Sequence, residues 1–401
     1  MIALARESDA PVAGAGAGAG QLPEFSDAPH PRDDHAVSAG SLLTIDLSAI
    51  RANYALIAER VAPARVAAVV KADAYGLGAA RIAPVLAQAG CRDFFVAHLA
   101  EAITLRPLLP VEARLYVLNG LQPGAEPACA AAGVLPVLNS LEQARRWRAL
   151  AETAPRALPA AIQIDSGMSR LGLSPEEVET LARDVAFFAR VPVALVMSHL
   201  ACADVPSDPA NAGQFARFQG FAARLPAAPL SLANSGGCFL PSVFHQHVAR
   251  AGVSLYGVAP NGVEDNPMRP VVRLEARVIQ TRTIQAGAGV GYGLTFTAPG
   301  ERRIATISIG YADGWPRSLG NRGAAWFAGV RLPIVGRVSM DSITLDVSAV
   351  PPGALGEGDA VELIGPSQSL ADVAADAGTI AYEILTSLGA RHARAYVGGG
   401  R

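Results

Sequence analysis

Residues 65–76, "RVAAVVKADAYG", contain the feature from which the fold and the chemistry of this chain can both be predicted. Lys71 is the only lysine among 401 residues, although Lys and Arg together number 33, so every other basic side chain is an arginine. A guanidinium group stays protonated in proteins, whereas a buried amine can lose its proton and act as a nucleophile. An apolar run precedes Lys71 and turn residues follow it, which predicts a strand that ends in a loop. We therefore expect Lys71 to have a chemical role, rather than to be a solvated cation at a strand end.

The sequence around this segment repeats one pattern eight times, an apolar strand-like run followed by an alanine-rich helical stretch. The first run is "RVAAVV" and the last is "VARAGVSLYG", which ends at residue 257. Eight strands that alternate with helices are typical of a TIM barrel, in which the active site lies where the strands run into the following loops. A doubly wound open sheet is the alternative, and the lack of a GxGxxG motif after an early strand disfavours it. We predict an α/β fold built on a (β/α)8 TIM barrel.

Beyond residue 271 the pattern changes to β-rich segments separated by glycine and proline turns, such as "VRLEARVIQTRTI" and "DAVELIG". This change predicts a TIM barrel over residues 49–271 and a mainly β C-terminal domain over residues 272–401. Residues 41–48 contain a strand-like segment, which we expect to pair with the C-terminal domain. Residues 1–40, with "AGAGAGAG" and several prolines, are predicted to form a disordered tail.

The composition limits the possible functions. A net charge of -2 without a basic stripe predicts neither nucleic-acid nor membrane binding. No uninterrupted apolar run reaches the roughly 18 residues of a membrane span, and residues 1–40 lack the pattern of a secretory signal. The four cysteines form no CxxC pair and the "HQH" motif has no acidic partner nearby, so we expect no metal site and no disulfide framework. We predict a cytoplasmic protein that acts on a small molecule.

Polar residues that suit catalysis follow several of the predicted strands. They are Lys71 and Tyr75 after the first strand, Arg170 after the fifth, His199 after the sixth, Asn234 and Ser235 after the seventh, and Arg250 and Gly252 on the eighth. Because the C-terminal ends of barrel strands meet at one rim, we expect these residues to converge there. An amine beside hydroxyl and backbone N–H groups suits a phosphorylated aldehyde, which lysine can bind as a Schiff base. Pyridoxal 5'-phosphate (PLP) has this chemistry.

Nine motifs also occur in the order in which they occur in a known family. They are "VVKADAYGLGA", "DSGMSRLG", "MSHLACAD", "ANSGG", "RAGVSLYG", "GYGLTF", "IGYADGWPR", "GRVSMD" and "AYEILTSL". In this series the chain resembles the alanine racemases, which are PLP-dependent enzymes of fold type III. The resemblance extends from Leu42 to Tyr396 and implies an isomerase that interconverts L-alanine and D-alanine.

The resemblance implies a role for each residue at the barrel rim. Lys71 would bind PLP covalently, and four residues would hold its phosphate: Tyr75, Ser235, Gly252 and Tyr382. Arg250 would face the pyridine nitrogen, with His199 against Arg250. Because a guanidinium group cannot hand a proton to that nitrogen, the ring would stay unprotonated and be a weaker electron sink than a ring paired with aspartate.

Racemisation needs an acid/base group on each face of the substrate Cα, and the resemblance implies Lys71 and Tyr292 in these roles. The pKa of a free lysine amine is about 10.4, so a desolvating or cationic site must lower it for work near neutrality. In the family the two bases come from different subunits, which implies a homodimer with shared active sites. Arg170 and the backbone at Met340, beside Asp341, would bind the carboxylate of the amino acid substrate. Four residues match the substrate channel of the family: Tyr311, Arg317, Arg337 and Asp204.

One position departs from the family pattern. Many members have a carbamylated lysine two residues before the aspartate of "DSGM", where it orients the arginine of that motif. Here the residue is Gln163, which can accept a hydrogen bond from Arg170 but supplies no negative charge. Either a bound anion such as chloride replaces the carbamate, or Arg170 is held less firmly. This difference leaves a broad-specificity amino acid racemase of the same fold as an alternative.

Two further alternatives are less consistent with the sequence. A fold-type III decarboxylase should show a glycine triplet for the phosphate and a Cys–Asp pair, whereas "GGG" occurs only at residues 398–400. A non-catalytic PLP carrier would consist of the barrel alone, but this chain continues into a long β domain. The sequence favours neither the supply nor the breakdown of D-alanine.

Overall fold

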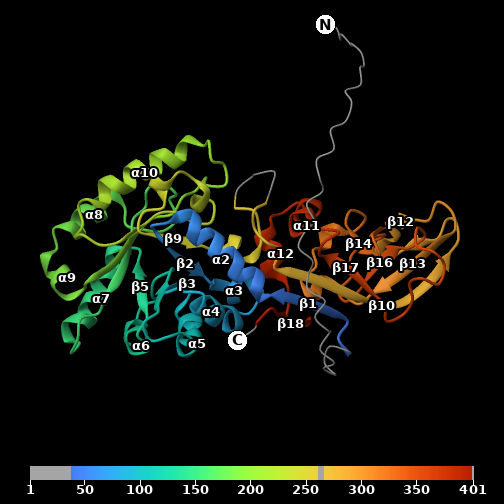
Figure 1. The fold of residues 1–401 in the computed structure, drawn as a ribbon, viewed down its shortest axis with the longest axis horizontal. Coiled ribbons are helices and arrows are strands. Elements are labelled where there is room, and N and C mark those ends of the chain that lie inside the picture. Colours follow the sequence, from blue (N-terminus) through green and yellow to red (C-terminus); the bar gives the residue numbers. More distant parts are fainter. Residues whose placement is uncertain (1–37, 261–265, 400–401) are drawn as a thin grey trace, which may run out of the picture.

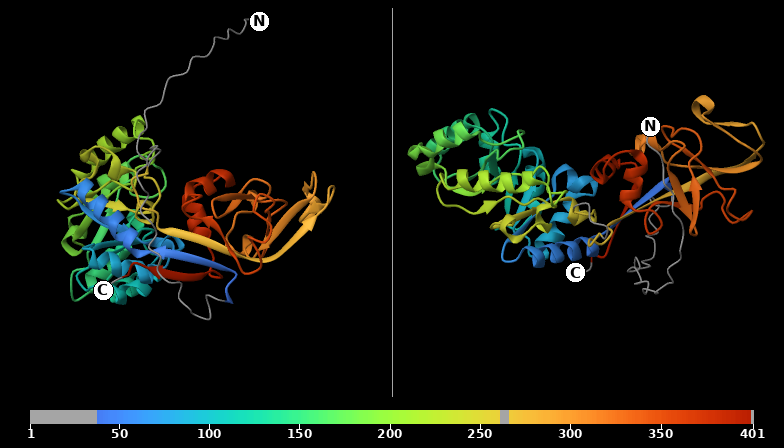
Figure 2. Two further views of the ribbon diagram at one scale, coloured as in Figure 1. Left: turned by 45° about the vertical axis from the view of Figure 1, so that its right-hand side comes forward. Right: turned by 90° about the horizontal axis from the view of Figure 1, so that it is seen from above.

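The computed structural model describes residues 38–260 and 266–399 of the chain. It has two parts that lie next to each other along the long axis of the molecule, a barrel wrapped by helices and a sheet-rich domain (Figure 1). The same two parts are separate in both further views (Figure 2). The predicted disordered tail, residues 1–40, lies outside the described residues except for its last three.

Eight parallel strands form the N-terminal barrel in the order β8-β7-β6-β5-β4-β3-β2-β9. They are β2 (Arg65–Val69), β3 (Asp93–Val96), β4 (Arg114–Val117), β5 (Leu135–Leu138), β6 (Ala160–Gln163), β7 (Val193–Met197), β8 (Leu230–Ser231) and β9 (Val248–Ala251). Backbone hydrogen bonds from His247 to Leu230 (3.0 Å) and from Arg250 to Ala233 (2.9 Å) link the two ends of the sheet. The predicted TIM barrel is therefore confirmed.

Helices cover the outside of the barrel, so its strands are buried on both faces and read as continuous apolar runs. The α-helices are α2 (Leu47–Val61), α3 (Lys71–Gly76), α4 (Ala79–Gln88), α5 (Leu99–Leu105), α6 (Glu126–Ala132), α7 (Leu141–Thr153), α8 (Pro175–Ala182), α9 (Val185–Arg190) and α10 (Pro209–Ala222). Short 3-10 helices are η1 (Arg106–Leu108), η2 (Gly237–Phe239), η3 (Ser242–Phe244) and η4 (Val253–Tyr256). Every residue of β3, β5 and β6 is buried, as expected for central barrel strands.

The C-terminal domain is built on a second sheet of eight strands, which confirms the predicted mainly β domain. They are β1 (Ser41–Asp46), β10 (Val272–Ile284), β13 (Arg302–Ile307), β14 (Ala324–Phe327), β15 (Val330–Pro333), β16 (Ile343–Asp346), β17 (Ala360–Ile364) and β18 (Ala393–Val397). A small hairpin pairs β11 (Gly289–Val290) with β12 (Phe296–Thr297). The helices of this domain are η5 (Tyr292–Leu294), η6 (Tyr311–Asp313), η7 (Arg317–Leu319), α11 (Leu370–Ala377) and α12 (Ala381–Ser387).

Strand β10 connects the inner and outer parts of this domain. Its first half buries alternate residues and pairs with β1 and β17, and after a register shift between Val278 and Gln280 its second half pairs with β13. Strand β1 lies between β10, to which it is antiparallel, and β18, to which it is parallel. The long β10 extends away from the barrel toward the β11–β12 hairpin, with β12 near the far end of the molecule (Figures 1 and 2).

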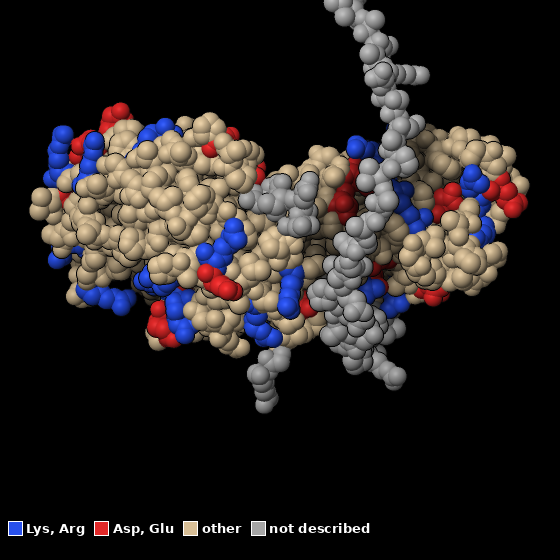
Figure 3. Space-filling model, turned by 45° about the horizontal axis from the view of Figure 1, so that its top comes forward, with Lys and Arg blue, Asp and Glu red and all other residues tan. Residues whose placement is uncertain are grey.

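The surface carries both signs of charge. On the face shown in Figure 3, acidic and basic side chains are interspersed and neither forms a continuous stripe. Within residues 38–260 and 266–399, no helix is both long enough and apolar enough to cross a membrane. The same residues contain no group of three or more His, Cys, Asp and Glu side chains that could hold a metal ion.

Candidate active site

Lys71 follows β2 directly and begins α3, whose backbone is left-handed. The φ angles of Ala72, Asp73, Ala74 and Tyr75 are 53°, 54°, 54° and 58°. For residues other than glycine this conformation costs about 1–2 kcal/mol each, and such strain is typical of functional sites. The strand that precedes Lys71 was predicted, but the loop expected after it is a turn of left-handed helix. This turn places Lys71 and Tyr75 together at the barrel mouth.

The surroundings of Lys71 favour the neutral amine. Burial lowers the pKa of Lys71, the charge of Arg170 lowers it further, Glu101 opposes this effect, and Arg250 adds to it. Lowering is the direction that the sequence analysis required for an amine that works near neutrality. The amine of Lys71 therefore has the environment of a nucleophile and base, not that of a surface cation.

Arg250 lies on β9 beside Lys71 and is held by neutral groups. Its Nη1 donates to Ser231 Oγ at 2.6 Å, and its Nη2 donates to the carbonyl oxygen of Ser198 at 2.6 Å. The same Nη2 faces His199 Nδ1 at 3.2 Å, so the histidine must accept there. Within the described part of the chain, the Nε–H of Arg250 has no hydrogen-bond partner and remains available to a ligand.

The charges around Arg250 also determine the state of the histidine. Burial lowers the pKa of Arg250 to about 10, so its guanidinium stays charged at neutral pH. Burial, followed by the charges of Arg250 and Arg170, lowers the pKa of His199 to about 3. His199 is therefore neutral and accepts a hydrogen bond from a permanent cation. The pair presents a fixed positive charge that cannot act as an acid near pH 7.

A polar cradle lies next to this pair, where β9 leads into η4. Ser235 Oγ accepts the N–H of Gly252 at 2.8 Å and that of Ser254 at 3.4 Å. The Ser254 hydroxyl is buried and has no partner among the described residues. Gly252 leaves room for Tyr75, since a Cβ at this position would lie 2.4 Å from Tyr75 Oη.

Two tyrosine hydroxyls complete the cradle. The rings of Tyr75 and Tyr382 lie 6.1 Å apart, and Tyr382 comes from α12 of the C-terminal domain. Burial and the neighbouring Tyr382 raise the pKa of Tyr75, while burial and Asp204 raise that of Tyr382. Both hydroxyls therefore stay protonated and can donate hydrogen bonds to an anion. The hydroxyls of Tyr75, Tyr382 and Ser235, with the unpartnered buried hydroxyl of Ser254, together fit a phosphate group, and Lys71 fits the aldehyde of PLP.

Tyr311 and Met340 lie on two loops of the C-terminal domain that contact each other. Tyr311 N–H donates to the Ser339 carbonyl and Ala312 N–H donates to that of Met340, both at 3.0 Å. The N–H of Met340 itself has no partner in residues 38–260 and 266–399, and 52% of the residue is exposed. Tyr311 and Arg317 line a cavity of about 550 Å³ together with Glu383 of α12. A free backbone donor at Met340 suits a carboxylate oxygen.

An ion-pair bridge that the sequence analysis missed ties these two loops together. Arg391 contacts Asp313 at 3.0 Å and Asp341 at 2.7 Å. Asp313 is buried, accepts the Gly310 N–H at 2.8 Å and receives a hydrogen bond from His392 at its carbonyl oxygen at 2.9 Å. The only sequence signal for Asp313 is its place inside the "GYADGWPR" motif, and Arg391 has none.

Gln163 does not contact Arg170 in the way that the sequence analysis considered. Its side chain is buried, and its Nε2 donates to the carbonyl oxygen of Leu171 at 3.2 Å. It therefore fixes the backbone next to Arg170 rather than the guanidinium group. Arg170 is exposed and forms no ion pair with any residue that the structure describes.

Tyr292 is not near Lys71 within this chain. It lies in η5, between β11 and β12, and 71% of the residue is exposed. Figure 1 places β12 far from the barrel. Arg337 lies beside it, since a Cβ on Gly293 would be 3.4 Å from the Arg337 guanidinium carbon. The structure thus gathers the predicted residues into two groups, one at the barrel mouth and one on the C-terminal domain.

Comparison with known proteins agrees with this geometry. The sequence profiles of the alanine racemase N-terminal and C-terminal domains match residues 45–260 and 271–396. An alanine racemase from Brucella canis is 55% identical over 388 residues, which are 93% of this chain and 98% of that protein. A catabolic alanine racemase from Agrobacterium fabrum is 56% identical over 366 residues, 91% of this chain and 94% of that protein. The crystal structure of alanine racemase from Bartonella henselae with covalently bound pyridoxal phosphate has a TM-score of 0.87 and 46% identity, covering 90% of this chain and all of that one.

Proposed function

The chain belongs to the alanine racemase family, and we propose that it interconverts L-alanine and D-alanine with PLP as its cofactor. One observation carries this proposal: the Lys71 amine, the Arg250 cation and the phosphate cradle share one barrel rim. Strands β2 and β9 are neighbours, with Ala67 opposite Arg250, so the residues that follow them lie side by side. No other arrangement of the described residues combines an amine of lowered pKa with a phosphate cradle.

The residues at the rim would divide the work of holding PLP. Lys71 would bind its aldehyde carbon, and the phosphate would be held by Tyr75, Ser235, Gly252 and Tyr382. The free Nε–H of Arg250 would face the pyridine nitrogen, with His199 against the guanidinium group. When bound, PLP supplies the electron sink that allows the Cα–H bond of an amino acid to ionise. Because Arg250 keeps its proton near neutral pH, it would leave the pyridine nitrogen unprotonated and the electron sink weak, which would favour return of the proton to Cα over side reactions.

The two-base mechanism assigns one protein group to each face of Cα. Lys71 moves a proton at its Nζ on one face, which requires the lowered pKa of this amine. Tyr292 of the partner subunit moves a proton at its hydroxyl on the other face. Arg170 and the backbone N–H of Met340 would orient the substrate carboxylate. Asp204, Tyr311, Arg317 and Arg337 would line the path by which the substrate reaches the site.

A homodimer with shared sites would bring the two groups of residues together. The exposed fractions of Tyr292, Tyr311 and Met340 are 71%, 43% and 52%. Such exposure is unusual for functional residues unless a second subunit covers them. The barrel mouth of the same chain is likewise uncovered at Arg170. If the C-terminal domain of one subunit covers the barrel mouth of the other, water is excluded, and this strengthens the electrostatic stabilisation of a carbanion.

Subunit mixing tests the two-base, shared-site proposal. Lys71→Ala and Tyr292→Phe should each be inactive, but a heterodimer of the two should contain one complete site and regain activity. Differently tagged subunits allow the heterodimer to be purified before it is assayed for D-alanine. A verified heterodimer without recovered activity would exclude the shared site.

The Tyr292→Phe homodimer provides a second readout. Racemisation should fall by at least about 10²-fold, as expected when one acid/base group is lost. In D2O the variant should still exchange the Cα hydrogen of one enantiomer, the one whose hydrogen faces Lys71. By analogy with the family we assign this enantiomer as D-alanine. Equal exchange of both enantiomers would contradict the assignment of one base to each face.

A broad-specificity amino acid racemase is the second candidate, because Gln163 does not hold the Arg170 guanidinium. A loosely held arginine restricts the position of the substrate carboxylate less, and longer side chains then fit more easily. The test is a panel of L-amino acids incubated with the purified enzyme in D2O, followed by chiral chromatography. Racemisation of alanine alone would exclude the second candidate.

We also propose a cytoplasmic location. All four cysteines are free thiols, and three of them are buried. Free thiols persist in reducing compartments. Cell fractionation should find racemase activity with cytosolic markers, and activity released with periplasmic markers would contradict this proposal.

A further inference from the structure

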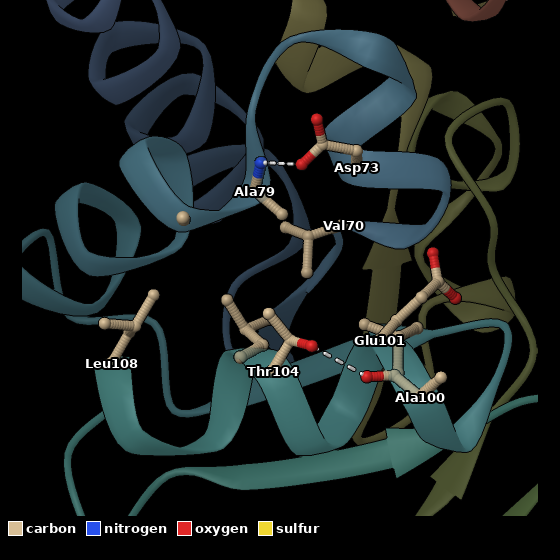
Figure 4. A pocket seen from close by; sticks show the side chains of 10 residues that line it. Val70, Asp73, Ala79, Ala100, Glu101, Thr104 and Leu108 are labelled. Atoms are coloured by element: carbon tan, nitrogen blue, oxygen red, sulfur yellow. Dashed lines mark hydrogen bonds between the residues drawn. The ribbon is translucent and has the colours of Figure 1, made fainter.

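The left-handed turn α3 buries Ala74 and Tyr75 on one side but has less packed support on the other. A cavity of about 340 Å³ lies under the turn, with Val70, Val96 and Leu105 among its lining residues. Asp73 and Glu101 also line it, and Figure 4 shows Glu101 on α5 with its carboxylate directed toward α3. On the side that borders the cavity, hydrogen bonds hold the strained turn where packed side chains do not.

The two ends of the turn are held differently. At the far end Arg394 donates to the Gly76 carbonyl at 2.6 Å, and Tyr396 donates to that of Leu77 at 3.0 Å. At the near end the N–H of Ala72, directly after Lys71, donates to Glu101 Oε1 at 2.6 Å. The Glu101 side chain thus holds the backbone of the residue that directly follows Lys71.

Glu101 joins this turn to the next strand of the barrel. Its Oε2 accepts the N–H of Ala97 and that of His98, both at 2.8 Å, where β3 leads into α5. Together with Ala72 this makes three backbone donors on one carboxylate. Hydrogen bonds to a charged acceptor are roughly twice as strong as neutral ones. The carboxylate can therefore fix the position of α3 relative to β3 and α5.

Glu101 also differs in sign from the other charged groups that act on Lys71. Arg170 and Arg250 are cations, and His199, whose pKa is lowered to about 3, is neutral. Among the described residues, Glu101 is the one carboxylate whose charge acts on this amine, and it opposes the lowering of the pKa of Lys71 that burial and the arginines produce. The Glu101 side chain thus both holds the backbone next to Lys71 and adds a negative charge near its amine.

We propose that Glu101 is a positioning residue for Lys71, which holds the left-handed turn that presents the amine and moderates the positive charge around it. This inference rests on the proposed function, in which Lys71 moves a proton at Cα. It predicts that loss of the charge shifts the proton transfer by Lys71 to lower pH. It also predicts that loss of the three-donor bridge misplaces the amine.

The test compares Glu101→Gln with Asp73→Asn in the full-length enzyme. Glu101→Gln removes the charge and one of the two accepting oxygens, so that either Ala72 or the Ala97–His98 pair loses its acceptor. Asp73→Asn is the matched control, because Asp73 Oδ1 accepts the Ala79 N–H at 2.7 Å in the same turn, while its charge is not among those that act on Lys71. Figure 4 shows this hydrogen bond above the same cavity.

The first readout is the pH dependence of kcat, which reports groups in the substrate complex. Glu101→Gln should move the limb that belongs to Lys71 to lower pH by about one unit, the low end of the effect of an opposite charge nearby. It should lower kcat by about 10- to 100-fold, as misplacement of a catalytic group by 1 Å does. Asp73→Asn should leave the pH position unchanged.

The second readout does not depend on activity. Lys71 is the only lysine, so acetic anhydride applied to the cofactor-stripped chain labels one internal peptide, which mass spectrometry quantifies as a function of pH. The midpoint for Glu101→Gln should shift to lower pH in parallel with the kcat profile. If the enzyme does not racemise alanine, the proposed function fails, and the labelling midpoint still tests Glu101.

Glu101→Asp keeps the charge but shortens the side chain by one methylene, so it should lower kcat while the labelling midpoint stays close to that of the wild type. This variant keeps the test decisive if Glu101→Gln does not fold. Three results would each overturn the proposal. They are a labelling midpoint in Glu101→Gln equal to that of the wild type, a shift of the midpoint in Asp73→Asn as large as that in Glu101→Gln, and an unchanged kcat in Glu101→Asp.

Discussion

Gly252→Ala is the substitution that most directly probes the phosphate cradle. An added Cβ would lie 2.4 Å from Tyr75 Oη and 3.3 Å from Tyr75 Cζ, with Val69 Cβ at 3.6 Å. Carbon and oxygen atoms that are not bonded separate to about 3.4 Å or more, so the Tyr75 hydroxyl must retreat by about 1 Å. That hydroxyl is one of the proposed phosphate donors. The substitution therefore removes a donor and narrows the cradle together.

The tyrosine has little freedom to move. Only 7% of Tyr75 is exposed, and its ring lies 4.8 Å from the Tyr256 ring and 6.1 Å from the Tyr382 ring, measured between centroids. Overpacking of a filled site costs typically 1–3 kcal/mol, roughly the range for one extra methyl group. If most of this cost falls on the PLP-bound state, the affinity for PLP drops by about 10- to 100-fold.

The assay titrates cofactor-stripped protein with PLP. Binding is measured as the decrease in tryptophan fluorescence. Gly220→Ala is the matched control, since Gly220 lies in α10 and a Cβ there would meet no atom within 4 Å. Alanine in a helix is favoured over glycine by about 1 kcal/mol, so this control should keep its PLP affinity and unfold at a slightly higher temperature. Wild-type affinity in Gly252→Ala, or an equal loss in Gly220→Ala, would refute the reasoning.

Three further outcomes are expected. Borohydride reduction of the PLP-loaded enzyme should label only the peptide that contains Lys71, and Lys71→Arg should remain unlabelled and inactive; a label on another peptide would contradict the central role of Lys71. Removal of CO2 and bicarbonate should leave activity unchanged because Gln163 cannot be carbamylated, and mass spectrometry should find a carbamate only in Gln163→Lys, not in the wild type. Asp93→Asn should lower the free energy of unfolding in urea by about 1–3 kcal/mol, because buried Asp93 contacts half-exposed Arg114 at 2.7 Å; an unchanged urea midpoint would show that this pair does not stabilise the barrel.

The barrel could be predicted because its strands are buried on both faces. The run "AAIQID" predicted a strand, and the structure has β6 at Ala160–Gln163. The run "LSLAN" also predicted a strand, yet β8 comprises only Leu230 and Ser231. The regular strand ends at Ser231, although the Ala233 carbonyl still accepts the Arg250 N–H at 2.9 Å. Beyond it, the side chains of Asn234 and Ser235 bond to neighbouring loops. The hydrophobic pattern of the sequence indicates which residues are buried. It does not show where regular backbone pairing ends and the residues of the site begin.

The left-handed turn after Lys71 could not be predicted from local sequence. Alanines at positions 72 and 74 favour right-handed helix, and glycine, which adopts positive φ without strain, first appears at position 76. The conformation is imposed by contacts from distant parts of the chain, from Glu101 at one end and Arg394 at the other. A propensity argument contains none of these contacts. The strain becomes visible only once the barrel brings the segments together.

The polar residues that the sequence analysis missed share one property. Glu101 is 29 residues from its partner Ala72, and Arg391 is 50 residues from its partner Asp341. Each acts by holding a backbone loop that carries a functional residue, so it has no chemistry of its own to indicate its role. Lys71, in contrast, is visible because its residue type is unique in the chain. Sequence reasoning finds groups that react more easily than groups that position them.

The structure gives a physical reason for a single lysine among so many arginines. Arg250 is buried, and even with its pKa lowered to about 10 it keeps its charge at neutral pH. A lysine at the same depth starts from a lower pKa, of about 10.4, so the same burial would bring its pKa much closer to neutrality than that of an arginine. The site thus uses arginine where a fixed cation is needed and lysine where a proton must move. Each arginine near Lys71 also favours its neutral form, so exchange of the two residue types at Lys71 and Arg250 would remove both the base and the field that tunes it.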